Sequence, residues 1–149
     1  MPLEPLPESI GILVSDVARL FWRRLEAAFA ADGLDFTAGE ARVLVTVADW
    51  PGERQTRLAE RLTLEPMTVT GHLDRLAARG LVERRPDPAD RRAKLVEPTV
   101  TGRVLTERIR SASARVRAHM LTDVAPADEA ALRTLLTRLR SALREEGLS

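Results

Sequence analysis

The sequence predicts a mainly α-helical fold with one small two-stranded β-hairpin. Apolar residues recur every three or four positions along most of the chain, which is the periodicity of amphipathic helices. Two five-residue strand candidates, 81–85 and 93–97, flank a turn-rich linker and predict the hairpin. With 149 residues, the chain is long enough to form a single domain with a buried core.

Composition excludes several classes of protein. Hydrophobic residues make up 44% of the chain and charged residues 30%, which is typical of a soluble globular protein and not of a disordered one. No stretch approaches the roughly 20 apolar residues of a membrane span, and residues 1–9 lack the pattern of an export signal. The chain contains no cysteine, which excludes disulfides, thiol catalysis and cysteine-bound metals. We therefore expect a cytoplasmic protein.

The first part of the chain is predicted to form two helices. The first begins near Ile10 and ends at Gly33, a residue type that commonly caps helices at their C-terminal ends. Thr37 and Glu40 have the spacing of a capping box, which predicts the start of the second helix. The segment 50–52 (Trp-Pro-Gly) ends that helix.

A short helix near Thr56 is followed by a longer one over residues 66–79. Proline at position 66 suits the first turn of a helix, because its missing N–H would have no partner there. Gly80 ends this helix. One side is a narrow apolar stripe formed by Val69, Leu73 and Leu76. The opposite side is small or polar and consists of Met67, Gly71, Asp74 and Ala78, flanked by Thr70 and Arg75.

Positive charge collects around the predicted hairpin. Residues 1–53 carry a net charge of −5, whereas segments 54–98 and 99–149 carry +3 each. Within the middle segment, the bases crowd into five positions: Arg84, Arg85, Arg91, Arg92 and Lys94. Such a cluster indicates a polyanionic partner, although a solvated charged loop explains the charge alone equally well.

The last third of the chain is predicted to form two amphipathic helices. Thr99 or Thr101 can cap the first, which runs to about Met120. Pro126 opens the second. Together with the N-terminal helix, they carry broad apolar faces. Packing within one chain and packing in a bundle between two chains are equally consistent with this pattern.

The order of these elements is that of a winged helix-turn-helix, in which the 66–79 helix enters the DNA major groove and the hairpin is the wing. The N-terminus of that helix can receive phosphate. Thr68 and Thr70 can hydrogen-bond to base edges, and Met67 can touch a thymine methyl group. A wing arginine can lie in a narrow minor groove. The alternatives are an ordinary exposed helix surface and a solvated hairpin tip.

At this level of detail the sequence resembles the MarR family of bacterial and archaeal transcriptional regulators. The resemblance is carried by segments 64–70, 73–76, 79–84 and 86–92, and by the pattern Thr99-x-x-Gly102-Arg103. The most diagnostic part is the Asp-x-Arg of the wing, Asp90 and Arg92. The resemblance covers essentially the whole chain.

The resemblance implies an obligate homodimer that reads a pseudo-palindromic operator in double-stranded DNA. Residues 1–149 would form a single MarR-type domain, with the winged-helix lobe at about 37–98 and dimerisation helices at 8–33 and 100–147. By position, Arg92 would enter the minor groove, and Asp90 would orient it through a charge-assisted hydrogen bond. Arg75 would contact phosphate or form a salt bridge to the wing. The candidate DNA-binding residues are Met67, Thr68, Thr70, Gly71, Arg75, Asp90, Arg91 and Arg92.

Two positions depart from the family's pattern. Gly71 stands where many relatives have arginine or another long polar side chain, which shifts base recognition onto Met67, the two threonines and the wing. Arg54 stands where relatives often have a small hydroxyl cap, so the start of the bracing helix near Thr56 is less well defined.

The expected function is a transcriptional regulator, a repressor released by a small molecule. Members of the family often bind phenolic or other apolar-anionic effectors between the dimer helices and the winged domain. The main alternative is a winged-helix module that binds protein and not DNA, and an oxidant sensor that depends on methionine is a second. No enzyme, metal or cofactor is expected, because His72 and His119 lie at no metal-binding spacing and no catalytic motif is present.

Overall fold

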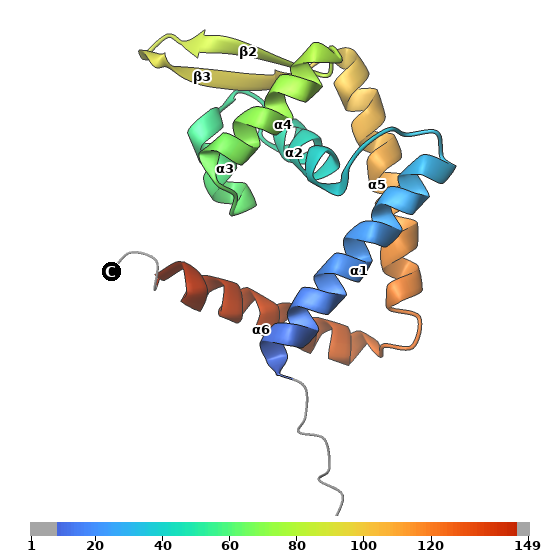
Figure 1. Ribbon diagram of the computed structural model, residues 1–149. Helices are drawn as coiled ribbons and strands as arrows, with labels where there is room; N and C mark the ends of the chain where they lie inside the picture. The colour runs from blue at the N-terminus through green and yellow to red at the C-terminus, as the bar shows by residue number, and fades with distance from the viewer. Residues whose placement is uncertain (1–8, 146–149) are drawn as a thin grey trace, which may run out of the picture. The chain divides into compact units, whose positions relative to one another are not determined.

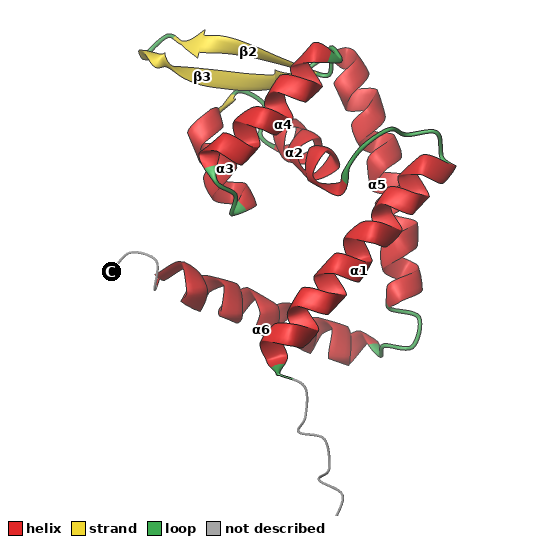
Figure 2. Ribbon diagram, in the orientation of Figure 1, coloured by secondary structure: helices red, strands yellow, loops and turns green. Residues whose placement is uncertain are grey.

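The computed structural model describes residues 9–145 and is mainly helical, with one small antiparallel sheet (Figures 1 and 2). The chain divides into two compact units, and the boundary between them along the sequence lies within the fifth helix. The first unit ends at Val116 and the second begins at Arg117. In chain order the elements are α1 (Ile10–Ala31), α2 (Ala38–Asp49), β1 (Glu53–Arg54), α3 (Gln55–Leu62), α4 (Pro66–Ala78), β2 (Val82–Asp87), β3 (Asp90–Pro98), α5 (Val100–Met120) and α6 (Pro126–Glu145). The predicted fold class and helix order are confirmed.

Helix α1 ends where the sequence predicts. The chain leaves the helix through Gly33, whose φ of +70° is a conformation that glycine adopts without strain. The amide of Leu34 donates to the carbonyl oxygen of Phe29 over 2.8 Å, which satisfies one of the last free carbonyl groups of the helix. Leu25 and Phe29 are the buried residues of α1.

Helix α2 begins with the predicted capping box. The Glu40 amide donates to Thr37 Oγ1 over 3.1 Å, and the Thr37 amide donates to Glu40 Oε2 over 3.2 Å. This helix supplies the centre of the core through Val43, Leu44 and Val47, which are fully buried.

Helices α3 and α4 pack against α2 and form the helix-turn-helix. The predicted apolar stripe of α4 is confirmed, since Val69, Leu73 and Leu76 are fully buried. α3 begins at Gln55 without a side-chain cap from Arg54. This agrees with the sequence, because arginine at position 54 has no hydroxyl group that could cap the helix.

The hairpin differs from the prediction in length. Strands β2 and β3 run on to Asp87 and Asp90, so the predicted linker 86–92 is wrong and the turn consists only of residues 88–89. Pro86 is tolerated because β2 is an edge strand in the order β1-β3-β2, and a bulge follows it. The Asp87 carboxylate accepts the Ala89 amide over 2.9 Å, which closes the turn. The two-residue strand β1 was not predicted, because it is too short to show a periodicity.

The start of α5 explains the pattern Thr99-x-x-Gly102. Thr99 Oγ1 accepts the Gly102 amide over 3.0 Å and donates to the Gly80 carbonyl oxygen over 2.6 Å, so Thr99 is the capping residue. Gly102 lies so close to Leu81 that a Cβ atom at position 102 would collide with the Leu81 carbonyl oxygen. The pattern therefore fixes the first turn of α5 to the end of α4.

Two helices carry long apolar faces that the chain leaves uncovered. Helix α6 buries none of its described residues. Its exposed apolar residues are Leu132, Leu135, Leu136, Leu139 and Leu143. Those of α1 are Ile10, Ile12, Leu13, Val14, Val17, Leu20 and Trp22. None of the described helices is long and apolar enough to cross a lipid bilayer.

Candidate nucleic-acid interface

The N-terminal ends of α3 and α4 and the strand β3 of the wing surround a recess of about 250 Å³, which we call the wing recess. It is lined by Arg54, Gln55, Thr56, Pro66, Thr70, Arg92, Ala93 and Lys94. Three of these residues are basic and none is acidic. Two helix N-termini together with Arg92 and Lys94 favour a negatively charged partner, whereas the charge of Arg54 is paired with Asp87.

The start of α4 carries two exposed predicted contact residues. Met67 is 83% exposed, and Thr68 is also exposed. Thr70 and Gly71 are half-buried. A Cβ atom at position 71 would meet only Arg75 Nη1 at 3.7 Å, which is an ordinary contact, so the absence of a side chain there is not dictated by packing.

Thr70 is held in place by a residue that the sequence did not single out. Its hydroxyl donates to the Pro66 carbonyl oxygen over 3.0 Å and accepts from Gln55 Nε2 over 2.7 Å. The single hydroxyl proton is therefore used within the helix, and Thr70 can offer only an acceptor to a base or a water molecule. No local pattern marks Gln55, because its partner lies 15 residues away.

The wing presents its arginines to solvent. The side chain of Arg92 is 98% exposed, and Arg91 is exposed beside it. Asp90 Oδ1 accepts the backbone amide of Arg92 over 3.1 Å but lies 3.9 Å from the guanidinium Nε. The predicted charge-assisted hydrogen bond from the Arg92 guanidinium to Asp90 is therefore not present in this structure, where the two side chains form only a long ion pair.

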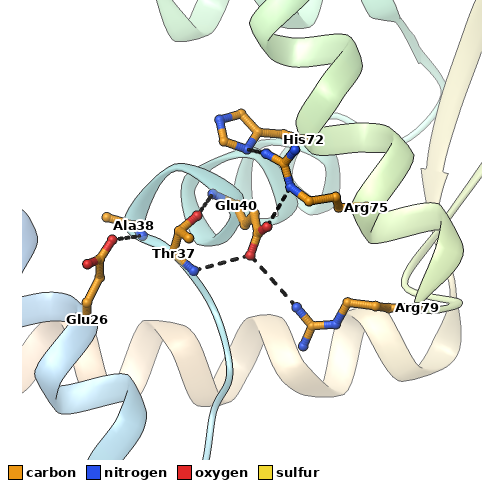
Figure 3. Close-up of polar contacts among 7 residues, drawn as sticks. All are labelled: Glu26, Thr37, Ala38, Glu40, His72, Arg75 and Arg79. Carbon is orange, nitrogen blue, oxygen red and sulfur yellow. Dashed lines mark hydrogen bonds and ion pairs between the residues drawn. The ribbon is translucent and has the colours of Figure 1, made fainter.

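Arg75 points away from the wing and toward α2 (Figure 3). Its Nε donates to Glu40 Oε1 over 2.8 Å, so the predicted salt bridge from Arg75 to the wing is wrong. The pair that joins α4 to the wing is Asp74 with Arg84, at 2.6 Å.

Glu40 is the centre of a polar cluster that joins α1, α2 and α4 (Figure 3). The residue is 8% exposed, and its Oε2 accepts the Thr37 amide and lies 3.9 Å from Arg79 Nη1. Burial alone would raise the pKa of Glu40, but the Thr37 amide and the Arg75 guanidinium hold that pKa below its ordinary value. Glu26 of α1 accepts the Ala38 amide over 2.8 Å. These contacts fix the recognition helix α4 against the rest of the lobe.

His72 completes the cluster. Its Nδ1 lies 2.9 Å from Arg75 Nη2, and because a guanidinium only donates, Nδ1 must accept and the ring must be neutral. Burial and the Arg75 charge lower the pKa of His72. The ring lies against Gly39, where a Cβ atom would come within 2.8 Å of it.

A helix-turn-helix with a β-wing, an exposed recognition-helix start and exposed arginines on the wing defines the class of winged-helix nucleic-acid-binding proteins. Residues 36–94 match the model of the MarR family. The chain is 31% identical over 108 residues to the HTH-type transcriptional repressor NicR of Pseudomonas putida. This alignment covers 71% of this chain and 68% of NicR. The chain is also 33% identical over 98 residues to the multiple antibiotic resistance protein MarR of Escherichia coli, covering 66% and 68%. The chain belongs to the MarR family.

Solved structures show the same fold. The PcaV transcriptional regulator of Streptomyces coelicolor, in complex with its natural ligand, has a TM-score of 0.82 at 24% identity and covers 96% of this chain and 99% of its own. A mutant of E. coli MarR complexed with operator DNA has a TM-score of 0.80 at 26% identity and covers 87% and 92%. The resemblance stated from the sequence is confirmed.

Proposed function

We propose that the protein is a homodimeric, sequence-specific DNA-binding repressor that a small molecule releases from its operator. The observation that carries this proposal is the wing recess, where α4 presents an exposed N-terminus beside Arg92, whose side chain is 98% exposed. In this arrangement, Met67 and Thr68 would face base edges, and Arg91 and Arg92 would face the backbone and the minor groove. Such a regulator would act in the cytoplasm.

The uncovered apolar faces support a dimer. An apolar stripe along α6 that stays exposed in a single chain would be unfavourable in water. A second copy of the same chain could bury this stripe in a dimer interface. Residues 9–33 and 100–145 would then join two lobes, each formed by about residues 37–98. Residues 8, 146 and 147 of the predicted dimerisation helices lie outside the described residues. Two lobes would read the two half-sites of a pseudo-palindromic operator, with recognition helices one helical turn of DNA apart.

Two neighbours support a small-molecule effector. PcaV was solved with its natural ligand, and the regulation of DNA binding by Bordetella bronchiseptica BpsR, which has a TM-score of 0.83 at 25% identity, is assigned to 6-hydroxynicotinic acid. In this chain, a hollow of about 490 Å³ lies among α1, the start of α2 and the end of α4. Its lining combines Phe36, Arg75 and Arg79 with three carboxylates, those of Glu26, Asp35 and Glu40. Both arginines lie beside Glu40, so the hollow offers room for a small ligand but its charges do not select an acid. An occupant there would touch the recognition helix directly.

The experiment is an electrophoretic mobility shift with the protein's own promoter fragment and a scrambled duplex of equal length. We expect the wild-type chain to prefer the promoter, and Arg92→Ala to weaken that binding by about 1–3 kcal/mol. The affinity of the wild type should also fall steeply with salt. Arg57→Ala on α3, whose partner is Glu60 within the same helix, is the matched control for the loss of one arginine, because Arg57 lies outside both the predicted contact residues and the proposed dimerisation helices. Unimpaired binding by Arg92→Ala would contradict the role of the wing, and no binding to any duplex at low salt would favour the protein-binding alternative.

A further inference from the structure

The junction between β1 and α3 sends two consecutive side chains to two different DNA-reading elements. Arg54 is the last residue of β1 and pairs with Leu95 of β3, while Gln55 is the first residue of α3. The side chain of Arg54 goes to the wing and that of Gln55 goes to α4. Both residues line the wing recess.

The first contact holds the tip of the wing. Arg54 Nε and Nη2 each lie 2.6 Å from Asp87 Oδ2. Because β3 lies between β1 and β2 in the sheet, the arginine reaches across β3 to make this contact. Asp87 is 7% exposed, and its other oxygen accepts the Ala89 amide. One carboxylate therefore closes the wing turn and binds the junction.

The ion pair is well placed to fix the orientation of the wing. In the first half of β2, Arg84 pairs with Asp74 of α4, so β2 is held both there and at its last residue, Asp87. Arg91 and Arg92 follow Asp90, the first residue after the turn that Asp87 closes. A wing fixed in this way loses less conformational entropy when DNA binds than a free one.

The second contact holds the recognition helix. Gln55 Nε2 donates to Thr70 Oγ1 over 2.7 Å, and Thr70 lies one turn after Pro66 on the accessible side of α4. The same two-residue junction thus determines both where the wing points and how α4 presents Thr70.

We infer that Arg54 and Gln55 are positioning residues that hold the wing and the recognition helix in a fixed relation for binding to DNA, an inference that rests on the proposed function. Their role is indirect, because Arg54 acts through Asp87 and Gln55 acts through Thr70. A direct contact between Arg54 and phosphate makes the opposite prediction for one variant. If Arg54 contacts phosphate directly, neutralising Asp87 should strengthen DNA binding, whereas if Arg54 acts through Asp87, neutralising Asp87 should weaken it.

The decisive variant is Asp87→Asn. Removing an acidic group near DNA would tighten binding if only charge mattered. If Asp87 anchors the wing, the variant instead weakens operator binding by about three- to tenfold, as does Arg54→Ala. Glu83→Gln is the matched control, because it removes one acidic group from the same strand at an exposed position. It should bind at least as tightly as the wild type.

Three further measurements separate the explanations. The exchanged pair Arg54→Asp with Asp87→Arg should recover part of the lost affinity. Arg92→Ala should lose less in the Asp87→Asn background than in the wild type, because the anchor acts through the wing. Gln55→Ala should weaken binding without changing the salt slope, whereas loss of a direct phosphate contact by Arg54 would reduce that slope by about 0.9.

The mobility of the wing can be measured in the absence of DNA. Backbone ¹⁵N order parameters of residues 87–92 in the full chain should fall in Asp87→Asn and Arg54→Ala and stay unchanged in Glu83→Gln. Unchanged order in the first two variants, or tighter operator binding by Asp87→Asn, would overturn the inference. If the wild-type chain binds no duplex, the proposed function fails, whereas the anchoring of the wing is still decided by the order parameters.

Discussion

The Nε atom of Arg75 lies 2.8 Å from Glu40 Oε1, so a charged hydrogen bond joins the recognition helix to α2 across 35 residues of sequence. The arginine side chain is 55% exposed, whereas that of Glu40 is only 11% exposed. The carboxylate is therefore the buried member of the pair and the one whose removal has structural consequences.

We expect Glu40→Gln to lower the free energy of unfolding by about 1–2 kcal/mol. The amide keeps the size of the side chain but cannot accept from both Thr37 and Arg75 as a carboxylate does. Urea unfolding followed by circular dichroism measures the change. Glu107→Gln, at an exposed ion pair on α5, is the control and should change stability by less than about 0.5 kcal/mol. Equal effects of the two substitutions would contradict this account of Glu40.

Acid should destabilise the protein through the same carboxylate and through Asp87. The Ala89 amide and Arg54 hold the pKa of Asp87 below its ordinary 3.8, and the pKa of Glu40 lies below its ordinary 4.5. The folded protein therefore binds fewer protons than the unfolded chain as the pH falls below these ordinary values. The free energy of unfolding should decrease through this range until both groups are protonated in the fold. Glu40→Gln should show a shallower decrease, and an identical pH profile would argue against the shift.

His72 should add a second pH dependence at higher pH. Since burial and Arg75 hold its pKa below the ordinary 6.5, the folded protein binds fewer protons than the unfolded one between the two values, and stability falls as the pH decreases through that window. The groups facing the ring are Arg75 of α4 and Glu40 of α2, and the charge of Glu40 opposes the shift only in part. NMR titration of the imidazole and urea unfolding from pH 7.5 to 5.5 test this directly. His72→Asn should lose the slope, because an amide oxygen can accept from Arg75 but does not titrate.

Gly102→Ala should be severely destabilising, by about 3 kcal/mol or more. The added Cβ would collide with the Leu81 carbonyl oxygen, which is backbone and cannot rotate away. Gly11→Ala in α1 is the matched control, since nothing lies within 4 Å of its added Cβ and alanine is the better helix former. Thermal unfolding of both variants distinguishes a local collision from a general effect of replacing glycine in a helix.

Gly71→Arg should strengthen DNA binding and make it more dependent on salt. Only Arg75 Nη1, at 3.7 Å, lies near the added Cβ, so the side chain fits and can extend from the exposed side of α4. One additional phosphate contact would steepen the plot of log affinity against log salt by about 0.9. Gly71→Ala separates the gain in helix stability, about 1 kcal/mol, from the effect of charge. A salt slope equal to that of the wild type would show that this position does not face the DNA backbone.

Much of the fold can be predicted from the sequence because its helix boundaries are set locally. Thr37, Glu40, Gly33 and Thr99 act on backbone groups within a few residues, so their spacing is informative. The wing was predicted too short because Pro86 suggests a loop, whereas an edge strand with a bulge accommodates it.

The contacts that arrange the candidate interface were missed for a different reason. Arg54 with Asp87 and Gln55 with Thr70 are separated by 33 and 15 residues. Neither periodicity nor capping patterns report such pairs. Arg75 was placed on the correct helix, but its partner depends on how α4 packs against α2. All eight candidate DNA-binding residues stay predictions: Met67, Thr68, Thr70, Gly71, Arg75, Asp90, Arg91 and Arg92.

Because α6 buries none of its residues, the stability of the proposed dimer would depend on protein concentration. If only a sister chain can shield those leucines, the melting temperature must climb with protein concentration, and dilution must loosen the end of each subunit before it loosens the core. Below some copy number, newly made chains would then be exposed to proteases faster than they find each other. Repression would then begin only above a threshold concentration of the protein, and no other molecule would be needed to set that threshold.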